Sequence, residues 1–181
     1  MSPENCELSR RYKTKGLPAE PVVIEADAGE RAALAGRFGL PGIDSLRAVI
    51  ALEPRGSAIR ATGTLDAAIR QACAVSGEEF PANIAEVIDL RFIEEGDTAA
   101  APTVDEDGEI EIELDADDCD EIEFSGESFD LGEAVAQTLG LAIDPYAEGP
   151  GADEARRKAG IAAEGEQDGP LAAMLKDFKP D

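Results

Sequence analysis

The chain has 181 residues, of which 43% are hydrophobic and 4% aromatic, and its formal net charge is −24. This length predicts one domain with tails, and the apolar fraction is enough for a mostly aliphatic core. The charge argues against direct nucleic-acid binding, because such binding depends largely on Lys and Arg at the phosphates. The charge favours basic proteins as electrostatic partners. An equally weighted alternative is that the acidic residues serve only to keep the protein soluble.

The composition also removes several classes of catalytic and metal site. The sequence has no histidine, which is the commonest general base and transition-metal ligand. Cys6, Cys73 and Cys119 are far apart and lack metal-ligand spacing, so neither a disulfide framework nor a zinc site is expected. No glycine-rich phosphate-binding motif is present. We therefore expect no catalytic residue, no cofactor, no metal and no enzyme activity.

The termini and the apolar runs bear on localisation. The N-terminus lacks the apolar core of a secretory signal, and no apolar run approaches the roughly 20 residues that span a bilayer. We therefore expect a cytoplasmic protein without a membrane segment, and a monomer by default.

The first third of the chain predicts a strand followed by a helix. Residues 1–20 look irregular, and 21–26 has the composition of a short strand. Asp27 and Glu30 form a capping-box pattern at the start of a helix over 28–38, which Gly39 ends.

Alternating apolar residues then predict the central strands of a sheet. The alternation covers 46–52, continues along 58–75 and returns over 82–94, after a turn at 76–81. The last two segments form a predicted antiparallel hairpin, in which Gly63 supplies a bend. Cys73 lies on the apolar parity, so we expect it to be a small buried core residue.

A strongly acidic segment follows the hairpin. Between Glu94 and Glu123 the sequence contains acidic side chains and no basic one. Residues 95–108 have the composition of a mobile loop, while 109–114 and 119–124 are candidate short strands whose charges suit a sheet edge. An alternative use of 105–123 is weak divalent-cation binding. Asp105, Asp107, Glu109 and Glu111 match part of a calcium loop, but Thr103 and Leu114 occupy the first and last ligand positions.

The last part of the chain predicts a well-capped helix and a tail. Asp130 caps a helix over 130–143, with Glu133 at its third position and Pro145 beyond its end. Residues 153–160 read as a short polar helix. A small amphipathic helix is expected over 170–178, where Leu171, Leu175 and Phe178 share one face and form a candidate hook for a partner groove.

These elements together predict an α+β fold. Its curved, mostly antiparallel sheet is built around 58–94, with two or three packed helices and partial closure into a barrel as one outcome. We expect a single domain over residues 1–150, with an acidic loop near 95–108, and a flexible tail over 151–181.

Three stretches of sequence carry a resemblance to a known family. They are ADAGERAALAGRFGLPGIDSLRA at 26–48, IRQACAVSGEEF at 69–80 and FDLGEAVAQTLGLAIDPY at 129–146. In this order and spacing they resemble the bacterial YceD family, or domain of unknown function 177, described as large ribosomal RNA subunit accumulation protein. Many members carry a Cys-x-x-Cys pair near the middle of the chain. Here the pair is Cys73 and Ser76, which argues against a metal or redox role.

The resemblance implies a role in large-subunit ribosomal RNA accumulation and ribosome assembly, without enzyme activity. It marks a set of motif residues as candidate partner contacts: Asp130, Leu131, Gly132, Glu133, Asp144, Pro145 and Tyr146. From the residues alone, helix capping and close packing explain most of them equally well. The leading hypothesis is an acidic adaptor that binds a basic ribosomal or assembly protein, and a weak divalent-cation-binding protein is the alternative.

Overall fold

The computed structural model describes residues 7–96, 103–104, 110–111 and 120–161. By its internal contacts the chain divides into a larger unit, residues 1–70 and 81–144, and a smaller unit, residues 71–80 and 145–181. The predicted helix at 170–178 and most of the predicted acidic loop at 95–108 lie outside the described residues.

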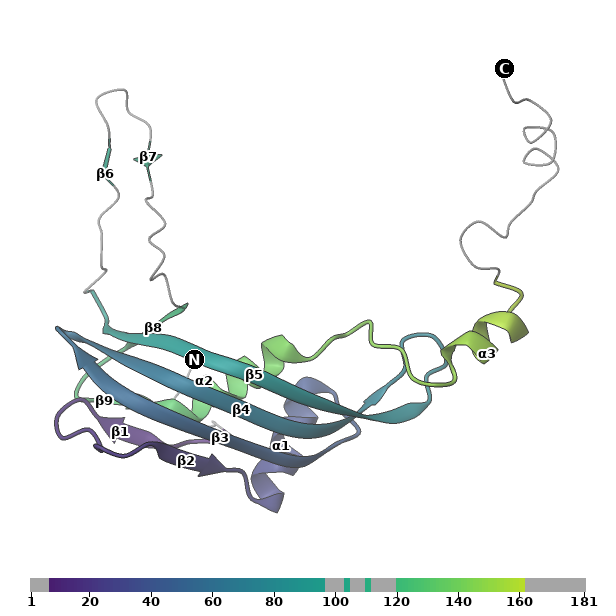
Figure 1. Ribbon diagram of the computed structural model, residues 1–181, viewed down its shortest axis with the longest axis horizontal. Helices are drawn as coiled ribbons and strands as arrows, with labels where there is room; N and C mark the ends of the chain where they lie inside the picture. Colours follow the sequence, from purple (N-terminus) through teal and green to yellow (C-terminus); the bar gives the residue numbers. More distant parts are fainter. Residues whose placement is uncertain (1–6, 97–102, 105–109, 112–119, 162–181) are drawn as a thin grey trace. The chain divides into compact units, whose positions relative to one another are not determined.

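A five-stranded curved sheet organises the larger unit (Figure 1). In spatial order its strands are β2 (Val22–Glu25), β3 (Gly42–Arg55), β4 (Ala58–Ala72), β5 (Glu79–Glu94) and β8 (Asp120–Phe124). β3 pairs antiparallel with both β2 and β4, whereas β8 runs parallel to β5. The sheet keeps two open edge strands and does not close into a barrel, and with its packed helices it confirms the predicted α+β class.

The helices α1 (Ala28–Phe38) and α2 (Leu131–Ala142) lie on the same face of the sheet (Figure 1). The predicted capping box of α1 is confirmed. Asp27 accepts hydrogen bonds from the backbone N–H groups of Gly29 and Glu30, and the Glu30 carboxylate accepts one from the Asp27 N–H. α1 ends at Gly39, whose φ of 66° is readily adopted by glycine.

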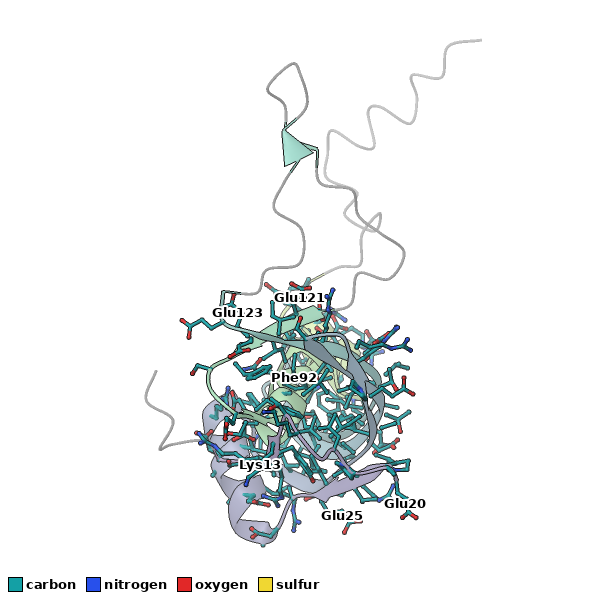
Figure 2. All side chains as sticks on the ribbon, turned by 90° about the vertical axis from the view of Figure 1, so that its left-hand side faces the viewer. Lys13, Glu20, Glu25, Phe92, Glu121 and Glu123 are labelled. Atoms are coloured by element: carbon teal, nitrogen blue, oxygen red, sulfur yellow. The ribbon has the colours of Figure 1, made fainter. Side chains whose placement is uncertain are left out.

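The core lies between the sheet and these two helices. Along β4 the predicted alternation is confirmed by a row of buried side chains: Ile59, Ala61, Leu65, Ala67 and Ile69. Phe92 of β5 lies in the interior, where its ring centroid is 4.5 Å from that of Phe129 (Figure 2). Figure 2 also shows Glu121 and Glu123 at the β8 edge and Glu20 and Glu25 at the opposite edge of the sheet.

Gly63 permits a close approach of β3 to β4. The register between these strands is continuous through Gly63, and its irregularity lies between Ile43 and Ser45 instead. A Cβ atom at Gly63 would lie 2.0 Å from the Val49 carbonyl oxygen and 2.9 Å from the Ile50 Cα. The glycine is therefore required by backbone proximity within a continuous strand.

Two short strand pairs accompany the main sheet. β1 (Arg11–Lys13) pairs antiparallel with β9 (Ser128–Asp130), so part of the stretch predicted to be irregular is a strand. β6 (Thr103–Val104) pairs antiparallel with β7 (Ile110–Glu111), which lies within the predicted 109–114 strand.

The smaller unit contains the turn after β4 and the segment after residue 144. Its helix α3 (Ala152–Lys158) corresponds to the predicted short polar helix. Acidic side chains occupy its first turn and basic ones its last, the order that the helix dipole favours. Across the described ranges of both units, every helix is too short or too polar to cross a membrane.

Candidate functional site

Asp130 joins the N-terminal segment to the start of α2. Its carboxylate accepts hydrogen bonds from the backbone N–H groups of Gly132 and Glu133 at 3.0 and 3.2 Å, which confirms it as the N-cap. The same carboxylate accepts the Arg10 N–H at 2.8 Å and a hydrogen bond from the Ser9 hydroxyl. One side chain therefore satisfies donors from two segments that are distant in sequence.

Gly132 and Glu133 also contact other segments at the start of α2. A Cβ atom at Gly132 would lie 2.4 Å from the Leu8 carbonyl oxygen, so only glycine lets the N-terminal segment pass this close. Glu133 accepts two hydrogen bonds from the Arg37 guanidinium of α1, at 2.9 and 2.8 Å. This bidentate pair raises the pKa of Arg37 above its ordinary value. The Asp-Leu-Gly-Glu motif thus connects α1 and α2 with the segment 8–10.

The second half of the predicted motif follows the other end of α2. Asp144, Pro145 and Tyr146 follow the C-terminal end of α2, and the Tyr146 side chain is 80% exposed. In the larger unit, α2 separates Asp130 from Asp144 by about 18 Å, at 1.5 Å per residue. Within the larger unit, the structure therefore does not bring Asp144 into one site with Asp130 and Glu133. The tail residues Leu171, Leu175 and Phe178 lie outside the described ranges.

Cys73 is buried in the smaller unit, as predicted, and is 3% exposed. The Ser76 N–H donates to its Sγ at 3.3 Å, and the Cys73 N–H donates to the Glu78 carbonyl at 2.8 Å, which closes the turn. Hydrogen bonds from the Ser76 hydroxyl, and then from backbone N–H groups, lower the pKa of Cys73 to about 7. Ser76 therefore stabilises the thiolate of Cys73 from three residues along the chain.

Replacing Ser76 with alanine is expected to raise the pKa of Cys73 toward its ordinary 9.0, because the hydroxyl that stabilises the thiolate is removed. The thiolate absorbance would be titrated in a Cys6→Ser/Cys119→Ser background. The thiolate contributes stability that is fully present above pH 9.0 and lost as the pH falls through about 7. The Tm difference between Ser76 and Ser76→Ala should therefore grow with rising pH, and a pH-independent difference would contradict this assignment.

A groove in the larger unit lies between the sheet and α2. It has a volume of about 560 Å³ and is lined by residues 86–90 of β5, 120–122 of β8 and one face of α2. On α2 this face includes Ala134, Gln137, Thr138 and Leu141. Val87 and Leu141 are 77% and 85% exposed, so two large apolar side chains are left in solvent at the groove.

One wall of the groove is an unpaired stretch of sheet edge. β8 pairs with β5 only along Leu90–Glu94. On that side, residues 81–89 of β5 have no partner among the described strands. Their outward-facing backbone N–H and C=O groups are available for a further strand.

The charge on the groove walls is of one sign. Glu86, Asp89, Asp120 and Glu121 line it, and no Lys or Arg is among its lining residues. Asp89 is held by two hydrogen bonds from Arg60, which lower its pKa, and Glu121 is paired with Arg91 at 3.2 Å. Glu86 and Asp120 form no ion pair within the described part of the chain. These two carboxylates can attract a cation from outside.

This groove was not predicted from the sequence, although the sequence contains one signal of it. Glu86 lies on the same parity of β5 as Ile84, Ile88, Leu90 and Phe92, so an acidic residue interrupts the apolar face. Glu86 is exposed, whereas Ile88, the next residue on the same face, is buried. The contribution of β8 had no such signal, because its parallel pairing with β5 depends on chain-distant contacts.

The divalent-cation alternative receives no support from the residues that are described. Among them, no group of three or more Asp, Glu or Cys side chains is placed to hold a metal ion. Asp105, Asp107 and Glu109 lie outside the described ranges.

Comparisons of the chain with known protein families, with curated proteins and with solved structures found no match.

Proposed function

We propose that this chain is a non-enzymatic acidic adaptor that supports large-subunit ribosomal RNA accumulation and ribosome assembly by binding a basic protein. The resemblance of 26–48, 69–80 and 129–146 to the YceD family supports the cellular role. The net charge of −24 supports a basic partner.

The observation that carries the proposal is the groove between β5, β8 and α2. It combines exposed apolar side chains with four acidic ones and has no basic lining residue. An apolar surface gives binding energy, while a surrounding charge of one sign selects partners of the other sign and accelerates their encounter. A basic ribosomal or assembly protein has the complementary charge.

Affinity capture from cell extract tests this function. The tagged chain should retain a basic ribosomal or assembly protein at about 0.05 M salt and lose most of it at about 0.5 M, because salt screens the attraction. Retention should survive RNase treatment. Capture of RNA without a bridging protein, or a partner that is insensitive to salt, would reject the proposal.

A chain ended at Gly169 locates the contact further. If the captured protein is retained without residues 170–181, the folded part carries the binding and the predicted tail hook is dispensable. If the protein is lost while the unfolding midpoint is unchanged, Leu171, Leu175 and Phe178 carry the contact instead of the groove.

A further inference from the structure

We propose that the groove binds an extended basic segment of the partner, which pairs with the open edge of β5 as an added strand. This inference rests on the proposed function and specifies its binding mode. The open edge comprises residues 81–89 of β5, whose outer side has no strand partner in the described ranges. It is roughly 30 Å long at about 3.3 Å per residue.

The geometry of the groove suits a partner segment in extended conformation better than a partner helix or a flat partner surface. β5 supplies one wall with free backbone groups, and α2 supplies the other wall with Thr138 and Leu141. β8 occupies the same edge of β5 from Leu90 onward, so an added strand would end near Asp120. Backbone hydrogen bonds to an exposed edge give affinity in this mode, and contacts to alternate side chains give specificity.

The side chains at the edge specify the chemistry of that segment. Ile88 and Ala134 are buried beneath the groove, while Val87 and Leu141 are exposed beside it. Glu86 and Asp120 have no cationic partner within the described residues. By parity and register, Glu86 and Asp120 lie on the same face of the sheet as Ile88, and Val87 lies on the other face. In a segment that alternates aliphatic residues with Lys or Arg, the basic side chains would therefore neutralise the two carboxylates, and their methylene stems would cover Leu141. The aliphatic side chains would lie on the face of Val87.

Charge argues against two other occupants of the groove. A second copy of this chain carries the same net charge of −24, so copies repel each other. The segment 112–119 carries Glu113, Asp115, Asp117 and Asp118 and no basic residue, so Glu86 and Asp120 repel it too. Glu86 lies on the same face of β5 as the buried Ile88, and a charge at such a position of an edge strand hinders unspecific strand pairing. A basic segment is the occupant that this edge accepts.

The test uses a fluorescent Lys-Val-Lys-Val-Lys-Val-Lys-Val peptide and the full chain. We expect the double variant Glu86→Lys/Asp120→Lys to weaken binding by about tenfold or more, because attraction becomes repulsion. The control Glu20→Lys/Glu127→Lys changes the net charge equally at exposed positions outside the groove. Equal losses in both double variants would overturn the proposal, since they would show a response to net charge alone.

Backbone pairing is tested with N-methylated peptides. Methyl groups on one set of alternate amides should abolish binding, and methyl groups on the other set should not, because only alternate N–H groups of an added strand face β5. Leu141→Ala should weaken binding several-fold, whereas Val23→Ala on the opposite edge strand should not. Equal binding of both methylated peptides would overturn strand addition.

The two proposals can fail separately. If affinity capture retains a basic assembly protein equally well with Glu86→Lys/Asp120→Lys, the binding mode is wrong and the proposed function stands. If the peptide binds with the expected amide pattern while capture yields no ribosomal or assembly protein, the groove is a strand-binding site and the proposed function is wrong.

Discussion

Replacing Gly63 with alanine is expected to lower the free energy of unfolding by about 3 kcal/mol, near the upper end for overpacked interiors. The new Cβ would lie 2.0 Å from the Val49 carbonyl oxygen and 2.9 Å from the Ile50 Cα. Both contacts are with the β3 backbone, which cannot move aside without breaking its pairing with β4. Urea denaturation followed by circular dichroism would measure the loss.

A matched control for this substitution lies in α1. Gly36 has open space around its Cβ position, so alanine adds no clash there. Gly36→Ala is expected to raise the free energy of unfolding by up to about 1 kcal/mol, because alanine restricts the unfolded chain and favours helix. If the two substitutions change the free energy of unfolding in opposite directions, the Gly63 effect is due to the contact with β3. Two changes of equal sign and size would contradict the close approach of the strands.

Replacing Asp130 with alanine is expected to lower the free energy of unfolding by roughly 2–3 kcal/mol. Loss of an N-cap alone costs about 0.5–2 kcal/mol, and the half-buried Arg10 N–H left without its acceptor adds to that cost. Asp130 caps α2 and also accepts the Arg10 N–H at 2.8 Å, so both segments lose an acceptor. Thermal and urea unfolding would measure the change.

Asp130→Asn separates capping from charge recognition. Asparagine keeps an acceptor oxygen and is a good N-cap, so the loss of stability should stay below about 1 kcal/mol. It removes the negative charge as fully as alanine does. If the affinity for the basic peptide is unchanged in Asp130→Asn, this residue fastens the fold. If that affinity falls while the fold is intact, Asp130 belongs to the partner contact.

The two ends of α2 have different roles, one in holding the fold together and the other in lining the groove. Its N-terminal end is held to Arg10 by Asp130 and to α1 through the Glu133–Arg37 pair. Its remaining turns place Gln137, Thr138 and Leu141 along the groove. A rigidly fastened helix keeps the groove wall in place when a segment binds, which reduces the ordering cost of association.

The sequence by itself determined the local structure. Asp27 with Glu30, and Asp130, specified the starts of α1 and α2, because capping uses atoms only a few residues apart. The alternation along β4 and β5 specified which side chains enter the core, since the side-chain period of a strand is two. From these local signals the α+β class and the burial of Cys73 could be predicted.

Only the tertiary structure decided the features that depend on chain-distant contacts. Gly132 is needed because Leu8 passes beside it, and Glu133 meets Arg37 of another helix. The candidate groove exists because β8 returns parallel to β5 and pairs only with Leu90–Glu94, which leaves 81–89 open. Neither the partner nor the register of such a pairing is encoded in local periodicity, because both follow from how all the elements pack together.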